Sequence, residues 1–316
     1  MTSSTSKRLT PDSTAVVVFD IDGVVRDVSG SYRRAIADTV EHFTDGAYRP
    51  SLADIDQLKS EGVWNNDWEA SRELVYRHFE GQVQGQSELS SVRLSVSALS
   101  TSTLRQAQGI ASSVFHLSKG HAEVSAMRTP TPLDYDSLVT FFNSRYRGSD
   151  PENWTGYICN EPLLLQVSYL ECLTSANILW GFFSGATRDE ALYALSKRLN
   201  LQTPILVAME DAPGKPNPTG LIAAVEQLQK RHDIEVELPT IYVGDTVADM
   251  YTVEKARTLH PERHWVSVGI LPPHVQETAE RREAYEKNLK RAGAARVFSN
   301  VQQLTPEQIW ELLQER

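Results

Sequence analysis

The sequence predicts an α/β fold, with a parallel sheet that carries helices on both faces and a mainly helical domain inserted after the first strand. Two observations predict this fold class. Short apolar runs alternate with helical patterns throughout the second half of the chain, which is typical of a parallel sheet. A further apolar run lies near the start of the chain, and helical patterns fill the interval between it and residue 178.

The first strand is predicted over residues 14–20, TAVVVFD. Its apolar residues follow one another without alternation, as they do in strands that are buried on both faces. Residues 1–13, which precede it, are polar and contain no apolar segment. We therefore expect a flexible tail there and no secretory signal.

Helical patterns after the first strand predict the inserted domain, which we place at 31–175, between core segments at 14–30 and 176–316. These patterns cover residues 31–43, 51–60, 67–80, 133–146 and 161–175. A segment between them, at about 82–128, is rich in Ser, Gln and Gly and has one aromatic residue, Phe115. Such a segment can bury too little apolar surface to fold, so we expect it to be disordered, with a specificity loop as the alternative.

The second half of the chain supplies the remaining strands of the sheet, at 178–184, 204–209, 240–245, 264–270 and 295–300. Helical patterns follow these strands at 187–199, 217–232, 246–259, 272–293 and 305–315. Local signals mark where three of these helices begin. Thr187 and Glu190 have the spacing of a capping box, Pro218 suits a first helical turn, and Thr305 precedes a proline as an N-cap residue.

The composition argues against several classes of protein. The net charge of −10 argues against a general nucleic-acid or membrane-surface binder, because both partners repel an acidic protein. No apolar stretch is long enough to span a membrane. Cys159 and Cys172 are the only cysteines, and neither lies in a metal or redox motif. We interpret them as reduced thiols of a cytoplasmic protein.

Polar residues follow four of the predicted strands. They are Asp20 and Asp22, Ser184 and Gly185, Lys215, and Asp245 with Asp249. The carboxyl ends of parallel strands meet at one edge of a sheet, so we expect these residues to lie close together. Each has a plain explanation when taken alone, since Asp245, for example, could cap the helix that follows it. Their joint placement at one edge instead predicts a functional site.

The pair of carboxylates after the first strand indicates what that site binds. Asp20 and Asp22 are two residues apart, so on a strand their side chains would point to the same side. Two close carboxylates repel each other, which predicts a positive group between them. Mg²⁺ suits this role, because proteins hold it with one or two carboxylates plus a phosphate. A carboxylate can also act as a nucleophile, and a lysine and a hydroxyl suit a transferring phosphoryl group.

Four short motifs resemble those of the haloacid dehalogenase-like (HAD) superfamily of phosphohydrolases. FDIDGV is similar to the first motif of the family, FFSGATR to the second, GKPNP to the third and VGDTVAD to the fourth, in the same order. The resemblance covers residues 14–28 and about 176–316. The helical insert resembles the type-1 cap of subfamily I. The resemblance therefore implies a Rossmann-like core, a cap domain and membership of the phosphatase branch.

The resemblance also implies a role for each residue that matches a motif. Asp20 would be the nucleophile that takes the phosphoryl group. Asp22 would be the general acid that protonates the leaving group, and then the base that activates water. Ser184 and the backbone of Gly185 would bind the phosphate, and Lys215 would offset negative charge on the phosphate and on Asp20.

The metal site implied by the resemblance uses the same strand ends. Asp245 would bind Mg²⁺ together with the side chain of Asp20 and the backbone carbonyl of Asp22. Asp249 would support this site through water or through Lys215. The only cofactor that we expect is therefore Mg²⁺.

The carboxylate at Asp22 favours phosphoryl transfer within the family, because haloacid dehalogenases proper lack it. The resemblance implies a phosphatase that hydrolyses a small phosphorylated metabolite through an aspartyl-phosphate intermediate. A sugar phosphate, phosphoglycolate or an amino-alcohol phosphate would suit this core. Two alternatives stay open, a phosphomutase of the same superfamily and a catalytically silent binding or regulatory protein.

The stretch GVWNNDWEAS in the predicted cap is the candidate for contacts with the leaving group. Trp64, Asn65, Asn66 or Asp67 would reach the leaving group, and Asn65 and Asn66 are the candidate substrate-binding residues. The structural alternative is that Asn66 or Asp67 caps a helix whose Trp68 faces the interior of the cap. We favour the structural interpretation for Trp68 and leave both interpretations open for the two asparagines.

Two arginines follow the first strand closely and lie at the start of the predicted cap. Arg33 is a candidate for binding an anionic group of the substrate, and Arg34 lies beside it. The alternative is that both are solvated arginines on a helix surface, which is the commoner situation.

Overall fold

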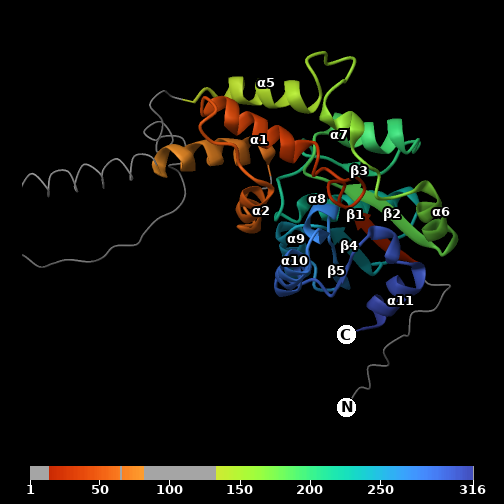
Figure 1. Cartoon of the computed structure of the whole chain (residues 1–316). Coiled ribbons are helices and arrows are strands. Elements are labelled where there is room, and N and C mark those ends of the chain that lie inside the picture. The colour runs from red at the N-terminus through yellow and green to blue at the C-terminus, as the bar shows by residue number, and fades with distance from the viewer. Residues whose placement is uncertain (1–13, 65, 82–132, 316) are drawn as a thin grey trace, which may run out of the picture.

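The computed structural model describes residues 14–64, 66–81 and 133–315, and Figure 1 shows their arrangement. The tail predicted at 1–13 and the disordered segment predicted at 82–128 lie outside these residues. Candidate residue Asn65 also lies outside them.

A six-stranded sheet forms the centre of the fold, and every adjacent pair of strands is parallel. Its order is β3-β2-β1-β4-β5-β6. The strands are β1 (Ala15–Phe19), β2 (Ile178–Phe183), β3 (Leu206–Val207), β4 (Thr240–Gly244), β5 (Trp265–Ile270) and β6 (Arg296–Phe298). β1 lies between β2 and β4, so the first strand of the chain is central in the sheet. The predicted fold class is confirmed.

Helices cover both faces of the sheet, and the residues of β1 show why its sequence is uniformly apolar. Val17 and Phe19 pack in one buried cluster, which contains residues of α6 (Val167–Ser175) and α11 (Pro306–Gln314). Val16 and Val18 pack in a second cluster, with α8 (Thr219–Arg231) and α9 (Val247–Leu259). Alternate side chains of a strand point to opposite faces, so both sets must be apolar.

Two predicted helices differ in detail from the observed ones. The pattern at 187–199 forms α7 (Arg188–Leu192), which continues as the π-helix η2 (Tyr193–Arg198). The pattern at 272–293 divides into a 3-10 turn, η3 (Pro273–Gln276), and α10 (Ala279–Arg291). The division follows from Thr278, whose side chain accepts a hydrogen bond from the backbone N–H of Arg281 and so caps α10.

The helices between β1 and β2, except α6, form a third buried cluster, which includes Ile36, Ile55, Val75, Phe142 and Ile158. These helices are α1 (Tyr32–Phe43), α2 (Leu52–Ser60), a helix at 67–81, α5 (Tyr135–Tyr146) and the 3-10 turn η1 (Tyr157–Asn160). Figure 1 shows α1, α2 and α5 together on one side of the sheet. We propose that they form the cap domain.

The last predicted cap helix, α6, packs differently from the others. Its residues Leu170 and Leu173 are buried in the same cluster as β1 and α11, and α6 lies against β2. We therefore propose that the cap domain ends before α6.

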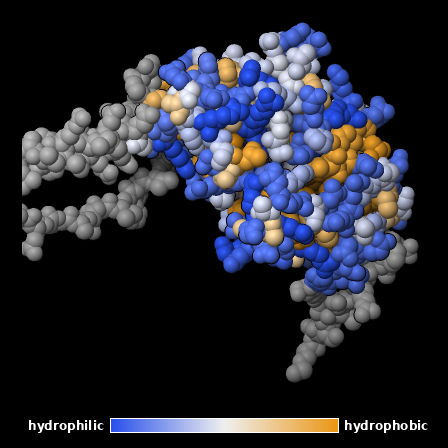
Figure 2. All heavy atoms as spheres, viewed as in Figure 1, coloured by the Kyte–Doolittle hydropathy of each residue, from blue (hydrophilic) through white to orange (hydrophobic). Residues whose placement is uncertain are grey.

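The surface of the viewed face is mostly hydrophilic, and apolar residues gather on it between α6 and α7 (Figure 2). The exposed large apolar side chains among the described residues are Val63, Val236, Tyr251 and Leu259, of which the last two belong to α9. No described helix combines the length and the apolarity needed to cross a membrane.

Candidate active site

The carboxyl ends of β1, β2 and β4 meet at a cavity of about 60 Å³ between the sheet and the cap helices. Asp20, Ser184 and Asp245 each follow directly on one of these strands, and all three line the cavity. Asp22 and Gly185 line it as well. The cap contributes most of the remaining lining residues, which are Tyr32, Arg33, Lys59, Asn66, Asp67, Trp68, Phe142 and Tyr146.

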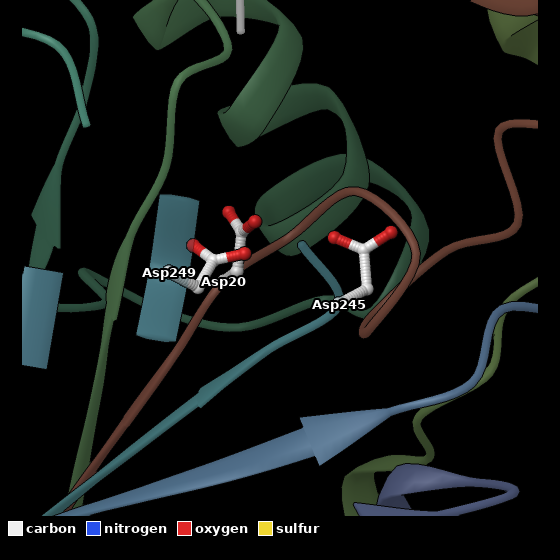
Figure 3. A group of neighbouring side chains, drawn as sticks. All are labelled: Asp20, Asp245 and Asp249. Carbon is white, nitrogen blue, oxygen red and sulfur yellow. The ribbon is translucent and has the colours of Figure 1, made fainter. Parts of the chain in front are cut away.

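Three buried carboxylates form the centre of this site. Asp20, Asp245 and Asp249 each place one carboxylate oxygen within 4.8 Å of the others. Figure 3 shows the three carboxylates turned to the same side of the strand ends. Burial raises the pKa of Asp20 to about 7, and the charges of Asp249 and Asp22 add to this rise while Lys215 opposes it. Burial and the neighbouring carboxylates likewise raise the pKa of Asp245.

Lys215 is the cation that contacts this cluster. Its Nζ lies 2.8 Å from Oδ2 of Asp20 and 2.7 Å from Oδ1 of Asp249, and its side chain is 2% exposed. Burial opposes the charged form of the lysine, but the two carboxylates outweigh it and raise the pKa of Lys215. One lysine against three carboxylates leaves a net negative charge. The donor set therefore fits a hard divalent cation such as Mg²⁺.

The start of α9 holds Asp249 in place. Thr246 is the N-cap residue. Its backbone N–H and its Oγ1 donate hydrogen bonds to the Asp249 carboxylate, at 2.9 Å and 2.7 Å. The hydroxyl of Tyr242 donates a further bond at 3.0 Å. The alternative that Asp245 caps this helix is therefore wrong. Because Thr246 is the cap, the Asp245 carboxylate is left to the cavity.

The loop after β1 brings the backbone beside Asp22 against Asp245. Gly23 has a φ of +74°, which disfavours other residues. A Cβ atom on Gly23 would lie 2.2 Å from Oδ2 of Asp245, so no side chain fits there. The glycine therefore permits the close approach that a shared metal site at Asp22 and Asp245 requires.

Asp22 is placed differently from the prediction. β1 ends at Phe19, so Asp20 and Asp22 are not neighbours on one strand, although both line the cavity. Each carboxylate has its own cation, because Asp20 contacts Lys215 and Asp22 contacts Nε of Arg26 at 2.7 Å. These contacts offset part of the charge of each carboxylate, and the Mg²⁺ expected between them remains a prediction. Arg26 is not among the predicted site residues, and its only signal in the sequence is a charge in the otherwise apolar run GVVR.

The second motif lies beside the carboxylate cluster. Ser184 is buried, its backbone N–H donates to the carbonyl of Val207 at 3.0 Å, and its Oγ accepts from the N–H of Ala186 at 3.1 Å. Gly185 lies between these two contacts and lines the cavity. Hydrogen bonds at the carboxyl end of β2 thus hold Ser184 and Gly185, the proposed phosphate-binding residues, in place.

The candidate residues of the cap have structural partners. Oδ1 of Asn66 accepts from the backbone N–H groups of Trp68 and Glu69, so Asn66 caps the helix at 67–81 while it lines the cavity. Arg33 is buried, lines the cavity and forms an ion pair with Asp56. Arg34 stacks its guanidinium 4.3 Å from the ring centroid of Tyr157. Substrate contacts for Asn66 and Arg33 remain predictions.

An ion pair that no sequence pattern predicts also lines the cavity. Nζ of Lys59 on α2 lies 2.6 Å from Oδ1 of Asp67. The two residues are eight positions apart on different helices, so no periodic pattern connects them.

Asp56 on α2 links the cap to the sheet domain and should make stability depend on pH. Its carboxylate contacts Arg33 of α1, Nε2 of His274 at 3.1 Å and Nη2 of Arg281 at 2.9 Å. Burial would raise its pKa, but the hydrogen bond from His274 and the charge of Arg33 outweigh burial and lower the pKa from 3.8 to about 2. A lowered pKa stabilises the folded protein above pH ~4, and this stabilisation is lost as the pH falls toward 2.

We expect Asp56→Asn to lower the free energy of unfolding at neutral pH by on the order of 1–2 kcal/mol, since solvent screening reduces the full effect of the shift. The difference from the unchanged protein should shrink below pH ~4, measured by urea unfolding at several pH values. Asp233→Asn is the matched control, because Asp233 is exposed with a φ of +52°, which asparagine also tolerates. Equal losses at pH 7 and pH 2.5 would contradict the linkage.

Comparison with known proteins identifies the family of this chain and one curated relative. Residues 14–257 match the family model for haloacid dehalogenase-like hydrolases. A curated relative is an imidazoleglycerol-phosphate dehydratase of Phytophthora nicotianae, 25% identical over 286 residues, which cover 90% of this chain and 50% of the relative. The chain thus spans about half the length of that relative.

Solved structures share the fold at low sequence identity. A phosphonoacetaldehyde hydrolase-like protein from Oleispira antarctica has a TM-score of 0.56 at 15% identity, covering 99% of this chain and 98% of its own. Phosphatase Tt82 from Thermococcus thioreducens has a TM-score of 0.51 at 22% identity, covering 86% and 99%. A HAD hydrolase of family IA from Entamoeba histolytica has a TM-score of 0.54 at 12% identity, covering 96% and 100%.

Proposed function

This chain belongs to the haloacid dehalogenase-like hydrolases, and on that premise we propose that it is a Mg²⁺-dependent phosphatase of a small phosphorylated metabolite. One observation carries the proposal. Three buried carboxylates lie within 4.8 Å of one another; Asp20 and Asp249 contact Lys215, and Asp20 and Asp245 line a small cavity. Such a site suits a metal ion, whose positive charge would offset the carboxylates and attract a phosphate. We also propose that the protein is cytoplasmic and binds neither nucleic acid nor membranes.

The family resemblance implies the residues for the metal, and the clustering of Asp20 and Asp245 supports them. The carboxylates of Asp20 and Asp245 and the backbone carbonyl of Asp22 would hold Mg²⁺, with Asp249 as support. Bound there, Mg²⁺ would offset the negative charge of the phosphate and of the carboxylates. Asp249 already accepts bonds from Thr246, Tyr242 and Lys215, so a supporting role suits it better than direct ligation.

In the proposed reaction an oxygen of Asp20 attacks phosphorus, and the bond from phosphorus to the ester oxygen breaks. Asp22 gives its proton to the leaving oxygen, which departs as an alcohol. Asp22 then takes a proton from water, which attacks phosphorus and releases inorganic phosphate from Asp20. Ser184 and the backbone N–H of Gly185 would bind the phosphoryl oxygens, and Lys215 would offset charge on Asp20 throughout.

The residues that line the cavity indicate the polarity of the leaving group. Beside the carboxylates the cap places the Lys59–Asp67 ion pair and Trp68. We therefore propose a polar leaving group, as in phosphoglycolate, a sugar phosphate or an amino-alcohol phosphate.

Release of inorganic phosphate tests the proposal. The purified protein is assayed with p-nitrophenyl phosphate and then with a panel of phosphorylated metabolites, with Mg²⁺ and with excess EDTA. The panel includes imidazoleglycerol phosphate, because a curated relative is named for it. We expect turnover that requires Mg²⁺. No turnover of any substrate in Mg²⁺ would contradict the proposal and favour a catalytically silent protein, whereas transfer between two positions of a sugar would favour a phosphomutase.

We expect Asp245→Asn to weaken Mg²⁺ binding while excess metal restores part of the activity, because the amide carbonyl can still be a ligand. Mg²⁺ affinity is measured by calorimetry without substrate, and activity is measured against Mg²⁺ concentration. Asp233→Asn serves as the control, since its exposed side chain does not line the cavity. An unchanged Mg²⁺ affinity in Asp245→Asn would show that Asp245 is not a ligand.

A further inference from the structure

A buried arginine lies directly behind Asp22. Arg26 is 0% exposed, and its Nε donates to Oδ1 of Asp22 at 2.7 Å. The loop between them is held by its own backbone, because the N–H of Gly23 donates to the carbonyl of Arg26. The side chain of Asp22 is 26% exposed and lines the cavity. Arg26 therefore contacts this carboxylate from the protein side and leaves its other side to the cavity.

A second carboxylate supports the arginine from behind. Oε2 of Glu161, which follows η1, lies 2.9 Å from Nη1 of Arg26. Oε1 of Glu161 accepts hydrogen bonds from the hydroxyls of Ser31 and Tyr146, which fix its position. Asp22, Arg26 and Glu161 thus form a chain of alternating charges that runs from the cavity into the interior.

This chain of charges is unfavourable as a purely structural feature. Among the described residues, Nη2 of Arg26 and Oε2 of Glu161 lack hydrogen bonds of good geometry. Apolar residues of similar volume often stabilise such a position better than a buried ion pair does. Its presence next to the proposed acid–base residue therefore points to a role in catalysis.

We propose that Arg26, supported by Glu161, is a positioning residue that fixes the carboxylate of Asp22 for proton transfer. Because Arg26 donates to Oδ1, the proton that Asp22 gives and takes is left to Oδ2. No other hydrogen bond to the Asp22 side chain occurs in the described part of the chain, so without Arg26 the carboxylate would rotate freely. The inference rests on the proposed function, in which Asp22 is the acid and then the base.

The variant Arg26→Met tests the inference through the dependence on the leaving group. Loss of a positioned acid should lower the single-turnover rate of the first step for an alkyl phosphate by about 10²-fold, and that for p-nitrophenyl phosphate by less than about threefold, because nitrophenolate needs little protonation. The affinity for both substrates should be unchanged. In an Asp22→Asn background, Arg26→Met should lower kcat by less than about twofold further, because both changes remove the same function.

Controls separate positioning from loss of stability. Arg263→Met removes another buried arginine, which pairs with Glu237 and does not line the cavity. It should lower stability without any dependence on the leaving group. If Arg26→Met does not fold, then Arg26→Lys and Glu161→Gln replace it. Each should give a smaller loss of turnover that again depends on the leaving group.

The outcomes distinguish the inference from the proposed function. The inference alone is wrong if the loss in Asp22→Asn depends on the leaving group while the Arg26 variants lower the turnover of both substrates equally. It is also wrong if the loss caused by the Arg26 variants adds fully to the loss in Asp22→Asn. If the unchanged protein releases no phosphate in Mg²⁺, the proposed function fails and the inference fails with it. Selective loss in Arg26→Met, absent in Arg263→Met, supports both.

Discussion

Asp20→Asn is expected to lower the turnover of every phosphate monoester by roughly 10⁴-fold or more, the effect typical of removing a catalytic nucleophile. An amide is nearly isosteric with a carboxylate but is a poor nucleophile. The phosphorylated intermediate should also disappear, because no carboxylate remains at position 20 to accept the phosphoryl group. The measurements are phosphate release in saturating Mg²⁺ and acid-quench trapping of labelled protein.

The same variant should keep its fold. Lys215 retains its contact with Asp249 at 2.7 Å, and one of three mutually repelling carboxylates is gone. The melting temperature without metal should therefore be equal to or higher than that of the unchanged protein. Asp233→Asn is the control for both readings. Activity near the normal level in Asp20→Asn would exclude Asp20 as the nucleophile, and a large fall in melting temperature would attribute the loss of activity to unfolding.

The sheet and most of its site could be predicted because they depend on local signals. The unbroken apolar run of β1 reflects its central place, with Val17 and Val18 on opposite faces. The polar residues that end β1, β2 and β4 meet because parallel strands share one carboxyl edge. Thr246 and Asp249 have a spacing that is both a capping box and part of the fourth motif.

The parts that could not be predicted depend on contacts between distant segments. Arg26 acquires its partner Glu161 from a turn 135 residues later along the chain, which no periodic pattern encodes. Lys59 and Asp67 meet across two helices of the cap. The predicted cap domain ends at residue 175, after α6, because the pattern of α6 is helical. The packing of α6 against β2, on which the proposed earlier end rests, cannot be read from the periodicity of the helix itself.

Asp22→Asn should separate the two steps of the proposed reaction. The backbone carbonyl of Asp22 is unchanged, so the affinities for Mg²⁺ and for inorganic phosphate should stay near normal. An amide can neither give a proton to the leaving oxygen nor take one from water, and general acid–base catalysis is typically worth ~10²–10⁴-fold. Turnover of alkyl phosphates should fall by that amount.

An activated ester makes the second step visible in the same variant. p-Nitrophenyl phosphate needs little protonation to leave, so its first step should remain fast and release a burst of nitrophenolate. Attack by water still lacks its base, so phosphorylated Asp20 should accumulate and be trapped by acid quench. Because Arg26 holds Asp22 at 2.7 Å, Arg26→Met should accumulate the same species to a smaller extent. Equal losses on both substrates, with no trapped phosphoprotein, would show that Asp22 does not act as the acid and base.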